Sequence, residues 1–265
     1  MAESNQTIRN YARGWSWGEQ HCRSRSRIKP YWYALRNPIA SVISYYKQRG
    51  IPLKRMLEVG CGGGNLGIRF SLHKIDAFFI DASLPVLKVC QDNMGRVLRF
   101  SKQHSSKSAV VCQDMFHLGF KDQVFDLVVS EGVFEHLHEK EARMQFLRES
   151  MRVVKKGGCV FVCIPNNAHP FVPYWKRKGC VWLNKELNPQ YYEIEFSGDD
   201  LKNELIESGL RDVVFDGCYL WDCIARHPST LARRMLTCVL KACVPEMTRR
   251  FRLRYALMVW AIGRK

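Results

Sequence analysis

The sequence predicts an α/β protein with a doubly wound, mostly parallel sheet of seven strands. Short apolar runs alternate with stretches whose apolar residues recur at helical spacing, and this alternation covers most of residues 51–218. The first apolar run ends in a cluster of glycines that leads into a helical pattern. Strands and helices that alternate at this pitch are typical of a parallel sheet with helices on both faces.

Each element is expected from its own pattern. Asn37-Pro38 is a cap followed by a first-turn proline, and Gly50 is a helix stop, so a helix lies between them. Ser197, followed by two aspartates, predicts the start of a later helix. Helices are expected at 37–50, 66–72, 84–100, 139–154, 197–207 and near 229–244, and strands at about 56–60, 76–81, 110–112, 124–130, 159–164, 212–215 and 255–262.

The glycine-rich turn after the first strand fits two kinds of nucleotide-type pocket. Residues 62–67 match the dinucleotide pattern G-x-G-x-x-G, in which an acid about 20 residues further on holds the ribose. Here the next strand ends in Asp81, only 14 positions after that match, which disfavours a dinucleotide. The other frame is Gly60-x-Gly62-x-Gly64, with Asp81 17 positions after its last glycine. A glycine turn that binds no ligand is the remaining alternative.

With Glu58 two positions before its first glycine, the second frame resembles motif I of the class I S-adenosylmethionine-dependent methyltransferases. Later segments match this family in order. The Glu-His-Leu at 135–137 and the Lys-Lys-Gly-Gly before the fifth strand resemble its small-molecule branch, typified by quinone-biosynthesis methyltransferases. The resemblance covers about residues 35–215 and the last strand. It implies a Rossmann-like fold with an antiparallel last strand, S-adenosyl-L-methionine as cofactor, and transfer of its methyl group.

The resemblance also implies roles within the cofactor site. The glycine loop would hold the methionine part of the cofactor, and Glu58 would orient that loop and the amino group. Asp81 would accept both ribose hydroxyls, because a carboxylate can accept two donors. Asp114-Met115 would hold the adenine, and the residues after the fourth strand would lie between cofactor and acceptor. The implied cofactor-binding residues are Glu58, Gly60, Cys61, Gly62, Gly64, Asp81, Ala82, Asp114, Met115, Ser130 and Glu131.

Two histidines are candidates for the base that an oxygen or carbon acceptor needs. His136 follows the fourth strand and can change charge near neutral pH, although Glu-His-Leu is also common scaffolding in the family. His169 lies in the loop after the fifth strand, where a plain loop histidine is the alternative. Eleven cysteines without a Cys-x-x-Cys pair predict no metal site and a reducing, cytoplasmic compartment.

The net charge of +16 is concentrated at the two ends of the chain. Residues 1–50 hold nine Lys and Arg against two acids, and residues 226–265 hold ten against one, so the middle is neutral. Such ends suggest an acidic partner, which could be a membrane surface, a phosphorylated substrate or RNA; solubility alone is the alternative. The helix near 230–244 carries an apolar stripe and is followed by Arg249 and Arg250. It could lie in a bilayer interface or cover the substrate pocket.

Four segments are therefore expected: a basic tail and capping helix (1–50), a methyltransferase core (51–218), a basic amphipathic insertion (219–252) and a final core strand (253–265). No apolar run approaches the ~18 residues of a membrane-spanning helix. We expect a cytoplasmic enzyme, with peripheral membrane contact as an option and the oligomeric state open.

The expected reaction moves a methyl group to an oxygen, nitrogen or carbon nucleophile of a small acceptor, with lipid-like and phosphorylated molecules both open. Residues 130–133 lack the Asn/Asp-Pro-Pro-aromatic signature of nucleic-acid amino-methyltransferases, which disfavours methylation of base amines. Two alternatives remain: an RNA methyltransferase whose basic ends contact phosphates, and a non-catalytic partner-binding protein on the same fold.

Overall fold

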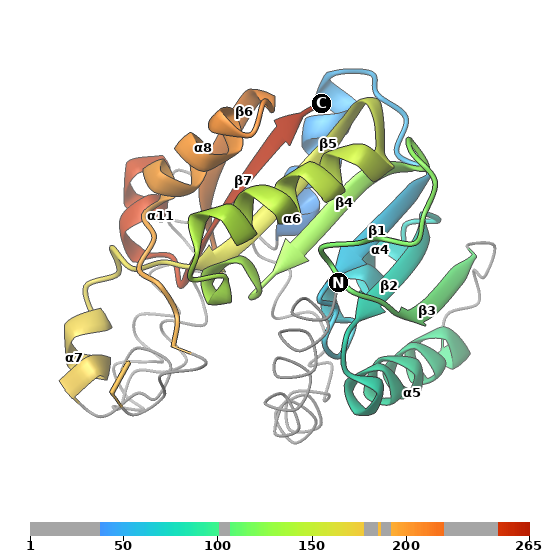
Figure 1. The fold of residues 1–265 in the computed structure, drawn as a ribbon, viewed down its shortest axis with the longest axis horizontal. Helices are drawn as coiled ribbons and strands as arrows, with labels where there is room; N and C mark the ends of the chain where they lie inside the picture. The colour runs from blue at the N-terminus through green and yellow to red at the C-terminus, as the bar shows by residue number, and fades with distance from the viewer. Residues whose placement is uncertain (1–37, 101–106, 178–184, 187–191, 220–248) are drawn as a thin grey trace.

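The computed structural model describes residues 38–100, 107–177, 185–186, 192–219 and 249–265. In this part of the chain one seven-stranded sheet has helices on both faces (Figure 1). The strands are β1 (Arg55–Val59), β2 (Asp76–Asp81), β3 (Ser108–Cys112), β4 (Phe125–Glu131), β5 (Val154–Pro165), β6 (Arg211–Cys218) and β7 (Met258–Arg264). The helices are α3 (Pro38–Gln48), α4 (Asn65–Ser71), α5 (Leu84–Phe100), α6 (Lys140–Val153), α7 (Val172–Arg177), α8 (Gly198–Glu207), α11 (Arg249–Tyr255) and the short 3-10 helix η2 (Phe134–His136).

The strand order is β3-β2-β1-β4-β5-β7-β6, which confirms the expected sheet. Strands β1 to β5 pair in parallel, whereas β7 runs antiparallel to both of its neighbours, β5 and β6. The chain winds outward from β1 to β3 and then returns to start again at β4. In doubly wound sheets, ligands bind beyond the carboxyl ends of the strands at such a reversal. The fold therefore places a binding crevice after β1 and β4.

The core consists of two apolar clusters, one on each face of the sheet. Neighbouring residues of a strand point to opposite faces, so Met56 of β1 joins one cluster and Leu57 joins the other. Side chains of α3, α4 and α5 complete the first cluster, and side chains of η2, α6 and α8 complete the second. Because both faces are covered, the middle residues of β1 and β4 are mostly apolar and buried, and the acids near the ends of these strands stand out.

Strand β5 begins earlier than the expected 159–164. Residues 155–158, which lie between the expected helix and the expected strand, belong to β5 and form an irregularity opposite Asp126. The buried Asp126 carboxylate holds this polar stretch in the sheet: it pairs with Lys155 at 2.7 Å, and its other oxygen accepts backbone N–H bonds from Lys54 and Arg55. The ion pair between Lys155 and Asp126 of β4 therefore extends β5 beyond the bounds that the local sequence predicts.

The last strand also differs from its expected bounds of 255–262. Tyr255 ends helix α11, and β7 runs over Met258–Arg264. The helix is fixed by Arg252, which pairs with Asp216 of β6 through its Nε at 2.8 Å and 3.0 Å, and by the Arg249 Nε, which donates to the Phe215 carbonyl oxygen. Arg249 and Arg252 thus join α11 to the sheet.

The expected helix near 229–244 and the tail before Pro38 lie outside the described residues. The four expected segments, including their boundaries at 218 and 252, therefore stay predictions. Among the described helices, none combines the length and the apolar character that crossing a membrane requires.

Candidate active site

The glycine loop between β1 and α4 has a backbone that only one of the two sequence frames explains. Gly60, Gly62 and Gly64 have φ angles of 67°, 52° and 73°, in the left-handed region that disfavours other residues. A Cβ on Gly60 would lie 2.4 Å from Val133 Cγ2, and one on Gly64 would lie 2.6 Å from Cys90 Sγ. The loop is therefore the Gly60-x-Gly62-x-Gly64 frame, packed against the segment that follows β4.

Glu58, the last-but-one residue of β1, supports this loop from below. Its side chain is buried, and Oε2 accepts the backbone N–H of Gly67 at 2.8 Å. A Cβ on Gly67 would lie 2.6 Å from that oxygen, so this glycine serves helix packing. Burial raises the pKa of Glu58 to about 8, against the lowering effect of the backbone donors. Its pKa is poised near neutrality, so a nearby ammonium group would favour the carboxylate.

Asp81 joins the end of β2 to the glycine loop. Its Oδ2 accepts the N–H of Gly62 at 3.1 Å, and its Oδ1 accepts the N–H of Ser83 at 3.0 Å. Burial raises its pKa, while these backbone donors lower it. A carboxylate oxygen can accept more than one hydrogen bond, so both oxygens of Asp81 can also accept a bond from a ligand hydroxyl. Ala82 is the next residue, and its carbonyl oxygen accepts from the Cys112 thiol.

Asn93 of α5 is a second anchor of the loop, and no motif in the sequence pointed to it. Its buried amide donates to the carbonyl oxygen of Gly63 at 2.9 Å. Cys61, expected in the cofactor site, has a buried side chain in the apolar core, and its backbone N–H donates to the Ile80 carbonyl oxygen. The contribution of Cys61 to a ligand would therefore come from its backbone.

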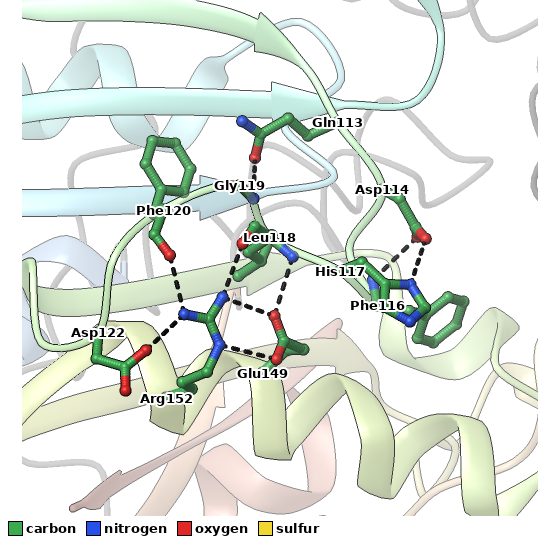
Figure 2. A network of polar contacts seen from close by, with 10 residues as sticks. All are labelled: Gln113, Asp114, Phe116, His117, Leu118, Gly119, Phe120, Asp122, Glu149 and Arg152. Carbon is green, nitrogen blue, oxygen red and sulfur yellow. Dashed lines mark hydrogen bonds and ion pairs between the residues drawn. The ribbon is translucent and has the colours of Figure 1, made fainter.

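Asp114 and Met115 lie in the loop after β3, and Figure 2 shows Asp114 there. The Asp114 carboxylate accepts the Phe116 N–H at 2.9 Å and lies 3.0 Å from His117 Nδ1, so it shapes its own turn. Met115 is half-buried and packs on the second core cluster. The expected adenine partners are thus placed after β3, beside the strand that carries Asp81.

Arg152 of α6 holds that loop in place (Figure 2). Its guanidinium donates to the carbonyl oxygens of Phe120 and Leu118 at 2.9 and 2.7 Å, and it forms ion pairs with Asp122 and Glu149. The hydrogen bonds from Arg152 lower the pKa of Glu149, which in turn accepts the Leu118 N–H at 2.9 Å. Sequence reasoning missed Arg152 because its partners in the loop lie 30 to 34 residues away along the chain.

Acidic residues gather beyond the carboxyl end of β4. Ser130 and Glu131 end that strand, and Glu135 and His136 follow in η2. One donor atom each of Glu135, His136 and Glu193 lie within 4.8 Å of one another, a set that could also hold a metal ion. Glu193 stands 57 positions further on, in an aromatic, proline-rich stretch without periodicity, so only the fold brings it here.

The acidic cluster (Glu131, Glu135, His136 and Glu193) is partly buried. Burial raises the pKa of Glu135 well above its usual range, and the charges of Glu193 and Glu131 raise it further. Glu131 also raises the pKa of Glu58, so the cluster adjoins the glycine loop. Tyr219, hydrogen-bonded to Glu131, has a φ of 58°, which is unusual for an aromatic residue and common at functional sites.

His169, the second candidate base, lies elsewhere in the network. It is buried, its Nδ1 accepts the N–H of Phe171 at 3.1 Å, and its ring also bonds the backbone of Tyr255 in α11. Burial lowers the pKa of the ring. These contacts fasten the loop after β5 to α11, whereas His136 belongs to the acidic cluster.

The described residues fit S-adenosylmethionine. The loop offers a cradle where Cβ atoms would collide, Asp81 offers two acceptors for a diol, and Glu58 offers a carboxyl whose ionised form an ammonium would favour. Glu58 lies near the carboxyl end of β1, the glycine loop follows β1, and Asp81 ends β2. A Rossmann dinucleotide loop would instead need Gly67 to approach the ligand, and Gly67 packs within α4 against Phe79.

Comparison with known proteins points the same way. Residues 57–162 match the family model described as a methyltransferase domain. The tRNA (carboxymethyluridine(34)-5-O)-methyltransferase of Arabidopsis thaliana is 31% identical over 41% of this chain and 23% of its own length. The chain spans about a quarter to a third of the first curated relatives that it matches.

Solved structures share the fold. A SAM-dependent methyltransferase of Thermotoga maritima, a possible histamine N-methyltransferase, superposes with a TM-score of 0.57 and 17% identity over 95% of this chain and 99% of that one. Magnesium protoporphyrin IX methyltransferase of Synechocystis, solved with bound SAH, gives a TM-score of 0.52 and 15% identity over 86% of this chain and 82% of that one. Residues 57–162 are a methyltransferase domain, and the chain has the class I, Rossmann-like fold of the S-adenosylmethionine-dependent methyltransferases.

Proposed function

We propose that this protein transfers the methyl group of S-adenosylmethionine to a nucleophile on a small molecule. The observation that carries this proposal is the continuity of the site: the cradle formed by the glycine loop, Glu58 and Asp81 adjoins a partly buried group of acids after β4. A cofactor site that opens onto polar groups, with the acceptor side partly removed from water, suits a transfer reaction better than a scaffold role.

In this proposal the residues of the chain position the cofactor and the acceptor. The cofactor supplies an electrophilic methyl group. The glycine loop and Glu58 hold the methionine portion, with Asp81 on the ribose and Asp114 with Met115 at the adenine. Ser130 and Glu131 face the acceptor side. His136 belongs to the acidic cluster and is the candidate base. Correct placement of the two reactants alone can supply ~7–11 kcal/mol of the rate acceleration.

The acidic cluster favours a small acceptor over RNA. The carboxyl groups of Glu131, Glu135 and Glu193 make the acceptor side unfavourable for the phosphates of a polynucleotide. RNA methylation stays the second candidate for two reasons: the similarity to a tRNA methyltransferase, and the exposed Arg250 and Arg254 of α11 as phosphate contacts. Cytoplasmic location and peripheral membrane contact through the basic ends belong to the proposal as well.

Calorimetry with S-adenosylmethionine, its demethylated product and NAD tests the cofactor. We expect micromolar or tighter binding of the first two and none of NAD. Tight NAD binding with no response to S-adenosylmethionine would overturn the proposal.

Transfer of radiolabelled methyl groups tests the acceptor class. The protein is incubated with labelled cofactor and, in parallel, with a small-metabolite extract, a lipid extract and total RNA. Label in the metabolite or lipid fraction is expected. Label in RNA alone favours the second candidate, and bound cofactor without any transfer favours a non-catalytic partner-binding protein.

A further inference from the structure

The acidic cluster is a built site, because its members are fixed from several sides. Residues 192–194, which carry Glu193, are tied to the segment after β4 by two contacts: the Ile194 N–H donates to the Glu135 carbonyl oxygen at 2.9 Å, and His138 Nε2 bonds the Tyr192 carbonyl oxygen at 2.9 Å. The His138 and Tyr192 rings also stack, with centroids 4.2 Å apart. Glu193 is thereby held against η2 by its neighbours on both sides.

Glu135 gives the independent sign of a ligand. It is 2% exposed, and its Oε2 is buried without a hydrogen-bond partner among the described residues. None of the ion pairs found in the described part of the chain includes it. A buried carboxyl that lacks a donor costs free energy unless something else satisfies it. The side chain is aimed at Glu193 and His136, so the missing donor belongs between these three residues.

The spacing and charge of the cluster suit an ammonium group. Acceptor atoms arranged tetrahedrally around an ammonium nitrogen at about 2.8 Å lie about 4.6 Å apart, close to the separation found here. The donor atoms of Glu135, His136 and Glu193 all fall within 4.8 Å of one another. The nearby Glu131 adds a further negative charge on the side of the glycine loop.

We propose that Glu135, Glu193 and Glu131, with His136, form the acceptor subsite and bind a primary or secondary amine in its protonated form, so that the reaction is N-methylation. The inference rests on the proposed function, since it names the acceptor class of the same site. The protein would act on a small cationic amine and discriminate against the alcohol of the same shape.

The step balances with the groups present. A carboxylate of the Glu135–Glu193 pair takes one N–H proton of the bound ammonium. The freed nitrogen lone pair then forms the N–C bond to the methyl group, while the S–C bond breaks and its electron pair stays on sulfur. Burial and the neighbouring acids raise the pKa of Glu135 well above its usual range, which favours the carboxyl group that has taken the proton.

Binding to the full chain saturated with the demethylated cofactor product tests the inference. Calorimetry compares two amines, butylamine and 2-phenylethylamine, with their alcohols, butan-1-ol and 2-phenylethanol. We expect the amines to bind about 10-fold or more tightly than the alcohols, because hydrogen bonds to charged groups dominate the subsite. In a separate incubation with labelled S-adenosylmethionine in place of the product, labelled methyl groups should appear on the amine nitrogen.

Two variants localise the effect. Glu135→Gln and the half-buried Glu193→Gln should each weaken amine binding about 10-fold or more and leave product binding and the melting temperature close to those of the unmodified protein. Glu195→Gln is the matched control, since Glu195 is exposed and bonds Asn167 and Lys176 outside the cluster. Glu193→Gln keeps the test decisive if Glu135→Gln fails to fold.

Three results would overturn the inference. Amines that bind no better than alcohols, while the product binds normally, would remove the amine subsite and leave the proposed function standing. Tight binding of Mg²⁺, Mn²⁺ or Zn²⁺ that Glu193→Gln abolishes would make the cluster a metal site instead. Failure of the product itself to bind would contradict the proposed function, and the inference with it.

Discussion

At the scale of single residues, the cofactor assignment depends most on Asp81 and Glu58. Both are acids at the carboxyl ends of neighbouring parallel strands, and both bond the backbone of the glycine loop or of the helix after it. The resemblance to the methyltransferase family singled out both residues, because each stands at the family's spacing from the glycine loop. The hydrogen-bond partners of Asp81 and Glu58 could not be predicted from the sequence.

Asp81→Ala should weaken S-adenosylmethionine binding by about 10- to 100-fold, because a carboxylate that accepts two hydroxyls contributes ~1.5–3 kcal/mol through charge-assisted hydrogen bonds. Calorimetry measures the change. Asp92→Ala, an exposed aspartate on α5, is the control and should bind normally. An Asp81→Ala protein that binds within about twofold of the original would place the ribose elsewhere.

Glu58 should make the protein less stable as pH rises. Its pKa is raised by burial from 4.5 to about 8 in the folded chain, so the folded state holds its proton more tightly than the unfolded state. The resulting stabilisation is complete below the unfolded pKa and is lost as pH rises through about 8.

Thermal melts at pH 5 and pH 8.5 of the original protein and Glu58→Gln measure this effect. The variant keeps an acceptor for Gly67 and should lose less stability over that range. Equal losses in the two proteins would mean that Glu58 ionises as freely as in water.

At the scale of elements, α6 reaches across to the loop after β3, which carries the adenine residues of the proposed site. Arg152 donates hydrogen bonds to that loop and to Glu149 (Figure 2). Glu149 also holds the loop, because its carboxylate accepts the N–H of Leu118. The position of this loop therefore depends on a helix that contributes no residue to the proposed cofactor site.

Arg152→Ala should lower the free energy of unfolding by about 1–3 kcal/mol, because it leaves the carbonyl groups of the loop without donors. It should also weaken S-adenosylmethionine binding, since Asp114 and Met115 would no longer be held in place. Denaturant unfolding and calorimetry measure the two effects. Arg148→Ala on the same helix removes only an exposed pair with Glu141 and should change neither.

Elements with their own local signals were predicted well. Ser197 forms a capping box with Asp200, and Gly50 follows α3 with a φ of 62°, both as expected from cap and stop residues. The failures share a cause in distant contacts. The stretch 155–158 stays extended because of Asp126, and α11 forms beside β6 because Arg252 meets Asp216. Glu193 joins the site because the backbone N–H of Ile194 donates to the Glu135 carbonyl oxygen, a contact that no local sequence pattern predicts.

At the scale of the whole molecule, the charge is divided between a neutral core and basic ends. The described part of the basic end is α11, where Arg250 and Arg254 are exposed beside Phe251. Cations next to exposed aromatic side chains suit an anionic lipid surface, where each cation near the surface contributes ~1 kcal/mol.

Sedimentation with vesicles that contain anionic lipid should therefore capture the protein at low salt and release it as salt rises. Arg250→Glu with Arg254→Glu should reduce the captured fraction, whereas Lys121→Glu with Lys156→Glu, exposed sites in the neutral core, should not. A protein that ignores the vesicles at low salt, or loses capture equally in both double variants, has no lipid surface at α11.

The position of β7 has a consequence for biosynthesis. It is the final strand along the chain, yet it lies between β5 and β6 and supplies the pairing partners of both. A nascent chain emerging from the ribosome can assemble β1 to β5 as soon as they are made. Strand β6 has no place to dock until residues 258–264 have left the exit tunnel. Until then the outer edge of β5 stays unpaired, which makes it the part of the growing molecule most in need of chaperone protection.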